Sequence, residues 1–457
     1  MSGLFDSLSI ATSALTAYRT GLDVAGQNIA NINTPGYVRR TVTLAERAPT
    51  EALGPGHGVD VLGIQAHRSE LIDGRIGHEQ AGLSHDSALL DGLKEVESAI
   101  GLPGSSLDAD LDGLFTSFSQ LATDVTSSSA RDSVVRQAQT LAQGFGALSG
   151  RITELQRSTN VSVRDAVGQL NQLTDRFAQL NGQIISRNGT DVEALKDERA
   201  NVLADIQSLA DVSVITRGDG GLDLTMPQGQ ALVLGGTSNA VSLVSTAPSG
   251  AVSLMLSDFD VTSQVTNGRL GGLITLRDTV LGGYQTNLDQ LAYDVATQVN
   301  AVHASGYDAN GNAAGNFFTA PAAVAGAAAA MAVDPSLAAD SQLLAGSATG
   351  AVGDNQTARA LAGIRNARVM SGGTATAAEA WSNFVYQVGS DVATAQSTSG
   401  TREAVVRQLQ QLRDQASGVS LDEEAANLMK FQRSYEASAR FFTTVNDTLT
   451  TLMAMVQ

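Results

Sequence analysis

The two ends of the chain carry the same hydrophobic rhythm, and this limits the possible folds more than any other feature. Large apolar residues recur at alternating spacings of four and three, which places them along one stripe of a helix. The stripe near the first end comprises Leu4, Leu8, Leu15, Tyr18, Leu22 and Ile29. The stripe near the last end comprises Leu421, Leu428, Phe431, Tyr435, Phe442, Val445, Leu449, Leu452 and Val456. We interpret both stripes as an assembly interface, with ordinary core packing as the alternative.

Helix-terminating residues mark where the first helix ends and where the last helix begins. The first helix should stop near residues 30–37, where Pro35-Gly36 favours a type II turn. The last should begin after Gly418, with Ser420 as a cap and acidic residues in its first turn. The first helix enters the rest of the chain at its C-terminal end, and the last leaves it at its N-terminal end. We call the place where both helices connect to the rest of the chain the root. If the two helices pair along their length from the root, they must be antiparallel.

Between the ends, the sequence predicts a helical body interrupted by one β region. Helical periodicity covers most of residues 85–209, in several helices, and resumes at 271–302, 377–396 and 401–416. From 212 to 261, short β-branched runs alternate with turn signals, which is typical of a small all-β unit.

The predicted fold class is mainly α with a small all-β inserted domain. The terminal helices form an antiparallel coiled-coil-like pair, on a body of long helices with a β outer domain. The predicted domains are a terminal helical assembly domain (1–37 and 418–457), a helical body domain (38–210 and 269–417) and a β-rich outer domain (211–268). Within the body, we interpret residues 304–352 as irregular.

Composition excludes several classes of function. The 457 residues carry a net charge of −18, which disfavours binding to duplex nucleic acid or to an anionic membrane. There is no cysteine, which excludes disulfide scaffolds, iron–sulfur sites and thiol catalysis. The first twenty residues lack the basic start and apolar run of a cleavable signal peptide. The longest nearly apolar run, 322–333, is too short to cross a bilayer.

Motifs that would indicate catalysis or metal binding are incomplete. The sequence His78-Glu79-Gln80-Ala81-Gly82 starts like a zinc-protease motif but lacks its second histidine. Residues 308–312 resemble the start of a calcium loop but lack its glycine and glutamate, so a solvated turn is the better interpretation. His78 and His85 share a helix face without a clear third ligand. We expect no catalytic, metal or cofactor-binding residues, and no enzyme.

The sequences at both ends resemble those of a known family. Ala30, Asn31, Asn33, Thr34, Pro35, Gly36 and Tyr37, after a heptad helix, resemble the N-terminal signature of bacterial flagellar axial proteins, which include rod, hook and hook-associated proteins. Residues 417–440 resemble the C-terminal signature of the same family.

Stretches in the middle are similar to the hook-associated members in particular. They comprise Leu195-Lys196-Asp197-Glu198-Arg199, residues 229–236, residues 271–278 and residues 288–311. Longer members carry extra outer domains, so the single short β region here implies one small outer domain.

The resemblance implies a structural, non-enzymatic protein that joins hook to filament by self-assembly through its terminal helices. It implies export in an unfolded state by the flagellar type III system, and an extracellular location at the hook–filament junction. The implied partners are copies of itself, the hook protein, a second junction protein leading to the filament, and an export chaperone on the C-terminal helix. No nucleic acid, membrane or cofactor is implied. The alternatives are another axial protein, such as hook or distal rod, or a secreted helical adhesin or translocator.

Overall fold

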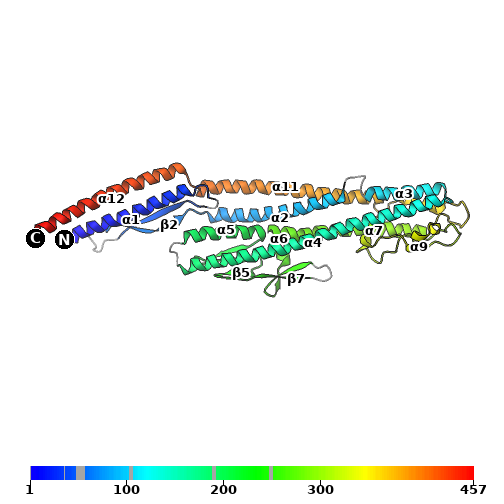
Figure 1. Cartoon of the computed structure of the whole chain (residues 1–457), viewed down its shortest axis with the longest axis horizontal. Helices are drawn as coiled ribbons and strands as arrows, with labels where there is room; N and C mark the ends of the chain where they lie inside the picture. Colours follow the sequence, from blue (N-terminus) through cyan, green and yellow to red (C-terminus); the bar gives the residue numbers. More distant parts are fainter. Residues whose placement is uncertain are drawn as a thin grey trace. The chain divides into compact units, whose positions relative to one another are not determined.

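The structure, a computed structural model, is mainly helical with three small β-sheets (Figure 1). The described residues are 2–34, 37–47, 57–101, 107–187, 192–245 and 251–456. Unit 1, the first of two compact units, comprises Met1–Ala81, Leu170–Val241 and Arg402–Gln457. Unit 2 comprises Gly82–Gln169 and Ser242–Thr401. The predicted fold class is confirmed.

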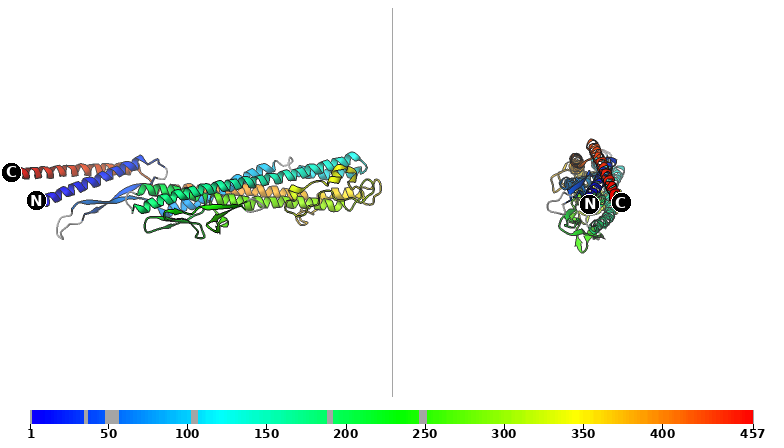
Figure 2. Two further views of the ribbon diagram at one scale, coloured as in Figure 1. Left: turned by 60° about the horizontal axis from the view of Figure 1, so that its bottom comes forward. Right: turned by 90° about the vertical axis from the view of Figure 1, so that its left-hand side faces the viewer.

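Unit 1 contains both terminal helices, α1 (Ser2–Ala30) and α12 (Leu421–Val456). Both views of Figure 2, like Figure 1, draw these helices side by side, with the two chain ends at the same end of the pair. They run antiparallel, as their shared root requires. The predicted turn at Pro35-Gly36 lies outside the described residues.

A β-hairpin follows the first helix in unit 1. Strand β1 (Arg40–Glu46) pairs antiparallel with β2 (Val59–Ala66). Both strands lie within the range 38–210 that the sequence analysis assigns to the helical body. A pair of strands joined by a long connection leaves no short turn signal, so local pattern alone misses it.

The described part of the predicted β region contains seven strands in two sheets. The first sheet has the order β3 (Ser213–Thr216), β4 (Leu222–Thr225), β5 (Ala231–Leu234) and β6 (Thr237–Ser238). The second has the order β7 (Val241–Ser245), β8 (Val252–Leu256) and β9 (Phe259–Asp260). The division between the two compact units falls after Val241, inside this region. The domain boundaries 211 and 268 stay a prediction.

The side chains of three asparagines of the long helix α4 (Ser128–Ser186) bond to backbone groups of the β region. Asn171 Nδ2 donates to the carbonyl of Val241 at 2.9 Å, and its Oδ1 accepts from the amide of the same residue at 2.8 Å. Asn181 bonds both backbone groups of Leu222 in the same way, at 2.8 and 2.9 Å. Asn160 Oδ1 accepts from the amide of Val252 at 3.0 Å. About three helical turns separate successive asparagines, so they share one face of α4.

Unit 2 is built mainly from helices. Among those described, α3 (Leu107–Thr123), α6 (Gly268–Ile274), α7 (Leu281–His303) and α10 (Gln356–Gly363) lie wholly within it, with a π-helical stretch at Thr275–Val280. Unit 2 also contains the larger parts of α2 (Glu70–Ile100), α4 and α11 (Ala377–Ser417), whose remaining residues belong to unit 1. The periodicity predicted two helices within α4 and two within α11, whereas each is continuous. Glycine inside a helix costs only about 1 kcal/mol, which burial of neighbouring apolar side chains outweighs. No helix in the described ranges is both long and apolar enough to cross a membrane.

The segment 304–352 holds only short helices, including α8 (Ala327–Ala330) and α9 (Pro335–Ala339), yet it contributes to the core of unit 2. Phe317 and Phe318 are fully buried within it. The interpretation of residues 308–312 as a solvated turn is wrong for Asp308, which is 6% exposed. Its Oδ1 accepts from the amides of Asn310 and Asn312 at 2.8 and 2.9 Å, so the carboxylate organises the turn.

His303, at the end of α7, ties this segment to the bundle through both ring nitrogens. The ring is 1% exposed; Nδ1 donates to the carbonyl of Gly315 at 2.8 Å, and Nε2 accepts from the amide of Ala345 at 2.9 Å. Because Nδ1 donates a hydrogen bond and Nε2 accepts one, the ring carries a single proton and is neutral. Burial lowers the pKa of His303, and the charge of Arg131 lowers it further, while the Gly315 bond and Asp334 oppose them.

We predict that the free energy of unfolding falls as pH drops below about 6.5, the ordinary pKa of histidine, because the unfolded chain then binds a proton that the folded chain excludes. The expected slope is at most about 1.4 kcal/mol per pH unit. Urea unfolding between pH 7.5 and 5.5 measures it. His303→Asn should flatten the slope, and His78→Gln, at an exposed position, should not. Equal slopes in both variants would refute the assignment.

Candidate functional site: the root of the terminal helices

The two terminal helices meet closely in the C-terminal half of α1. A Cβ atom at Gly21 would lie 2.8 Å from ring atoms of Phe431 on α12, a distance that side chains do not adopt. Glycine at this position therefore lets the phenylalanine ring pack directly on the backbone of α1.

The predicted stripe residues line the helix pair without being fully buried by it. Val445 is buried, at 7% exposed, while Leu421, Tyr435 and Leu452 are exposed. The side chain of Val456 lies outside the described ones. The remaining members are half-buried: Leu4, Leu8, Leu15, Tyr18, Leu22, Ile29, Leu428, Phe431, Phe442 and Leu449. Pairing within one chain thus covers part of each stripe and leaves part of it open.

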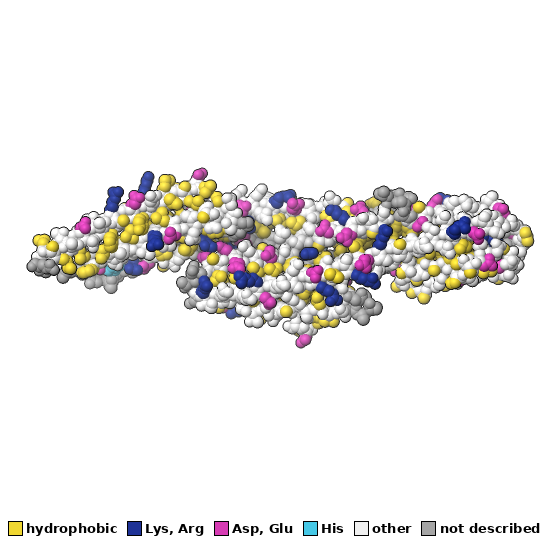
Figure 3. Space-filling view, in the orientation of Figure 1, with side chains coloured by type: hydrophobic (Ala, Val, Ile, Leu, Met, Phe, Trp, Pro, Cys, Tyr) yellow, Lys and Arg dark blue, Asp and Glu magenta, His cyan; other side chains and the backbone are white. Residues whose placement is uncertain are grey.

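Further apolar side chains of this pair are exposed outside the predicted stripes. They comprise Phe5, Met429, Phe441, Met453 and Met455. Figure 3 shows hydrophobic side chains gathered along the terminal helices. The heptad pattern missed these residues because it selects only one face. Apolar residues at the remaining helix positions were the signal that could have found them.

Asn28 fixes the turn at the C-terminal end of α1. Its Oδ1 accepts from the hydroxyl of Tyr37 at 2.8 Å and from the amide of Arg40 at 3.1 Å, while its Nδ2 donates to the carbonyl of Arg40 at 2.8 Å. The guanidinium of Arg40 lies 5.2 Å from the centre of the Tyr37 ring. Burial raises the pKa of Tyr37, and the charge of Arg40 opposes this rise.

Glu424, in the first turn of α12, connects this turn to the last helix. It is 2% exposed; Oε2 accepts from Asn28 Nδ2 at 3.0 Å, and Oε1 accepts from Arg39 Nε at 2.8 Å. Arg39 also pairs with Glu423 at 3.1 Å, but the Glu423 side chain is 62% exposed. A buried carboxylate is tolerated because a charged and a neutral donor satisfy it. The root is therefore an ion pair and an amide network shared by both chain ends.

The N-terminal signature residues surround this network. Among the described ones, Tyr37 belongs to it directly, Asn31 Nδ2 donates to the Gln27 carbonyl at 2.9 Å, and Thr34 Oγ1 donates to Asn31 Oδ1 at 3.2 Å. Ala30 and Asn33 are exposed, and Pro35 and Gly36 lie outside the described residues. Sequence reasoning missed Asn28, Arg39 and Glu424 as a set, because they are far apart in the chain.

The Leu195–Arg199 stretch lies on helix α5 (Glu193–Leu209) and contacts two other parts of unit 1, the β1–β2 hairpin and the first β-sheet. Asp197 pairs with Arg40 and Arg68, which flank the β1–β2 hairpin. Arg199 is 7% exposed and donates to Asn181 Oδ1 at 2.7 Å and to the carbonyl of Gly220 at 3.0 Å. Burial, followed by the positive charge of Arg68, lowers the pKa of Arg199 to about 10. The stretch thus joins the hairpin and the first β-sheet to the helices.

Within the described ranges, no three His, Asp or Glu side chains are grouped so that they could hold a metal ion. His78 is exposed, and His85 Nδ1 lies 2.9 Å from the carboxylate of its neighbour Asp86. The geometry of the root, with its open apolar stripes, suits association with other protein surfaces.

Three family models match separate parts of the chain. "Flagella basal body rod protein" matches residues 8–37, "Flagellar hook-associated protein FlgK helical domain" matches 93–318, and "Flagellar basal body rod FlgEFG protein C-terminal" matches 410–455. The first match contains Asn28 and Tyr37 of the root, and the last contains Glu424. These matches place the chain, with its helical fold and paired chain ends, among the structural components of the bacterial flagellum, in the axial class.

Relatives along the whole chain narrow this class. A flagellar hook-associated protein 1 of Escherichia coli (strain K12) is 25% identical over 95% of this chain and 97% of its own length. One of Bacillus subtilis (strain 168) is 27% identical over 98% of each chain. The flagellar hook junction protein FlgK from Burkholderia pseudomallei shares the fold, with a TM-score of 0.67 at 17% identity, covering 74% of this chain and 99% of that one. The chain belongs to the flagellar hook-associated protein 1 family.

Proposed function

We propose that this chain joins hook to filament, forming a short lattice zone by self-association of its terminal helices. The observation that carries this proposal is the incomplete burial of the α1–α12 pair. Phe5, Phe441 and Met455 are 56%, 45% and 80% exposed. A monomer that stays alone rarely keeps such a row of apolar side chains in water. Neighbouring copies of the chain would cover it.

The partners that we propose follow from this position. The hook protein lies on one side of the zone, and a second junction protein leading to the filament lies on the other. The chain reaches its extracellular place unfolded, through the flagellar type III system. Before export, a chaperone holds the C-terminal helix, whose exposed Met453 and Met455 would otherwise favour aggregation.

Labelling on isolated flagella tests the proposed location. The natural chain contains no cysteine, so Val352→Cys, at a position 93% exposed, gives one reactive thiol per subunit. A maleimide–gold label should mark a single short zone between hook and filament. Label along the hook or the rod would contradict the junction role and favour another axial protein. Flagella that carry the natural, cysteine-free chain and receive the same label control for background.

A further inference from the structure

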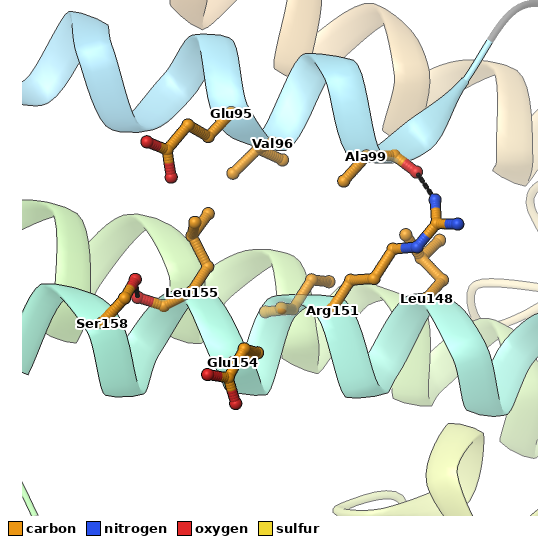
Figure 4. Close-up of a pocket in the computed structure, with 9 residues that line it drawn as sticks. Glu95, Val96, Ala99, Leu148, Arg151, Glu154, Leu155 and Ser158 are labelled. Carbon is orange, nitrogen blue, oxygen red and sulfur yellow. Dashed lines mark hydrogen bonds between the residues drawn. The ribbon is translucent and has the colours of Figure 1, made fainter.

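The helices of unit 2 are joined by apolar packing. Figure 4 shows one such contact, where Val96 of α2 and Leu148 and Leu155 of α4 line the space between the two helices. In the part of the chain that the structure describes, the large cluster of buried apolar side chains lies wholly in unit 2. Parts of a chain that share a large apolar interface keep a fixed orientation, whereas parts that meet through a smaller polar interface move relative to each other.

Unit 1 contains a part that is tightly packed within itself. We call it the terminal block; it comprises the described residues from α1 to the end of β2, together with α12. Phe431 of α12 packs on the backbone of α1 at Gly21. On the hairpin side, the amide of Val59 donates to Ser13 Oγ at 3.3 Å, and a Cβ atom at Gly58 would lie 2.2 Å from the same oxygen. Helix α1 is thus held closely by both α12 and the hairpin, so we expect the block to move as one body.

Two short segments connect the terminal block to the rest of unit 1. Residues 67–69 join β2 to α2, and residues 418–420 join α11 to α12. A hollow of about 350 Å³ lies at the second segment, and its lining includes Arg39 and Glu423 from the block and Asp414 and Gln415 from α11. Side chains of these types are usually solvated. The angle between the block and α11 can therefore change here without breaking apolar packing.

Polar contacts hold the block in place across this joint. The amide of Arg39 donates to the carbonyl of Ser417, the last residue of α11, at 3.1 Å. On α5, the carboxylate of Asp197 pairs both with Arg40, at the start of β1, and with Arg68, just after β2. These three side chains are 15%, 13% and 23% exposed, respectively. One carboxylate therefore holds the two strands of the hairpin at its base.

The closed position of these ion pairs leaves hydrogen-bond donors unsatisfied. Among the described side chains, the Nε atoms of Arg40 and Arg68 are buried and have no hydrogen-bond partner. A buried donor without a partner costs free energy, which offsets part of what the two ion pairs contribute. The contact with Asp197 thus suits a latch that can release better than a permanent anchor.

We propose that the terminal block swings as one body on the rest of unit 1, and that Asp197 is the latch that holds it in the closed position. When Asp197 releases the two arginines, the segments 67–69 and 418–420 take up the change of angle as hinges. The use of this motion in the lattice rests on the proposed function. Copies at the two boundaries of the junction zone can keep the same contacts between terminal helices while the rest of each chain meets different neighbours.

Distances between two spin labels on the purified full-length chain test the latch. The natural chain has no cysteine, so each label goes only to a chosen position. Gln408→Cys with Gln432→Cys measures across the joint, and Thr12→Cys with Gln432→Cys measures inside the terminal block; all three positions are exposed. Double electron–electron resonance should give narrow distance distributions for both pairs. Asp197→Asn should widen the distribution across the joint about twofold or more and leave the distribution inside the block unchanged.

Two further variants control for the loss of charge and for the shape of the side chain. Glu198→Gln removes a carboxylate at the next position of α5, but Glu198 pairs with the exposed Arg176 of α4 and not with the block. This variant should keep the narrow distribution across the joint. Asp197→Glu retains a carboxylate within reach of both arginines and should also keep it.

The outcomes separate this inference from the proposed function. A narrow distribution across the joint in Asp197→Asn, or equal widening in Glu198→Gln, would overturn the latch. Widening inside the terminal block would overturn its motion as one body. These distances are measured without flagella, so the latch can fail while the junction role stands. Conversely, a gold label away from the hook–filament boundary would refute the junction role and the use of the motion there, but not the latch itself.

Discussion

Glu424→Ala is expected to release the first turns of α12 from the root, whereas Glu423→Ala is not. Both carboxylates pair with Arg39, but the Glu424 side chain is 3% exposed and that of Glu423 is 62% exposed. Removing Glu424 leaves Asn28 Nδ2 and Arg39 Nε without their buried acceptor, at a cost of about 3–5 kcal/mol. Removing the exposed carboxylate costs about 0–1 kcal/mol.

Hydrogen exchange of the α12 amides measures this difference. Exchange in Glu424→Ala should be faster by roughly a hundredfold or more, and in Glu423→Ala by less than about tenfold. The two residues share the first turn of the helix, so the lost interaction with the helix dipole is common to both variants. Equal exchange rates in the two variants would show that Glu424 does not hold the root.

The second large effect concerns adjacent phenylalanines on different faces of α12. Phe442 is half-buried and shares a face with the buried Val445, whereas Phe441 is 45% exposed in a row with Leu452 and Met455. Phe441→Asp should leave the α1–α12 pair intact but place a carboxylate in the contact between subunits, at a cost of several kcal/mol. Phe442→Asp should weaken the pair as well as assembly. In both variants the core should melt at an unchanged temperature.

Motility, filament retention and secreted protein test these expectations together. Both variants should leave hooks without stable filaments and release subunits into the medium, provided that export still works. Asn446→Asp adds the same charge at an exposed polar position and should assemble normally. Normal motility of Phe441→Asp would show that this face stays in water. A large drop in the melting temperature of Phe442→Asp would show that the stripe is ordinary core packing and not an assembly interface.

The sequence alone determined the elements whose signals are local. The heptads predicted α1 and α12, and the shared root required them to be antiparallel. The alternation from Val212 to Val261 predicted the β strands, because turn residues lie between the runs. Periodicity also identified the helical body, although it divided α4 and α11 at positions where packing keeps each helix continuous. The resemblance at both ends located the family signatures but gave no contact between them.

Tertiary structure decided everything that joins distant parts of the chain. The buried ion pair joins Arg39 to Glu424 across 385 positions, and no local pattern marks one of three consecutive acidic residues as the buried one. The hairpin β1–β2, the asparagines that hold the strands and the buried Arg199 are likewise set by pairing between distant segments. Their energies depend on desolvation, which appears only once the chain has folded. For the same physical reason, the open faces of the terminal helices became visible only in the structure.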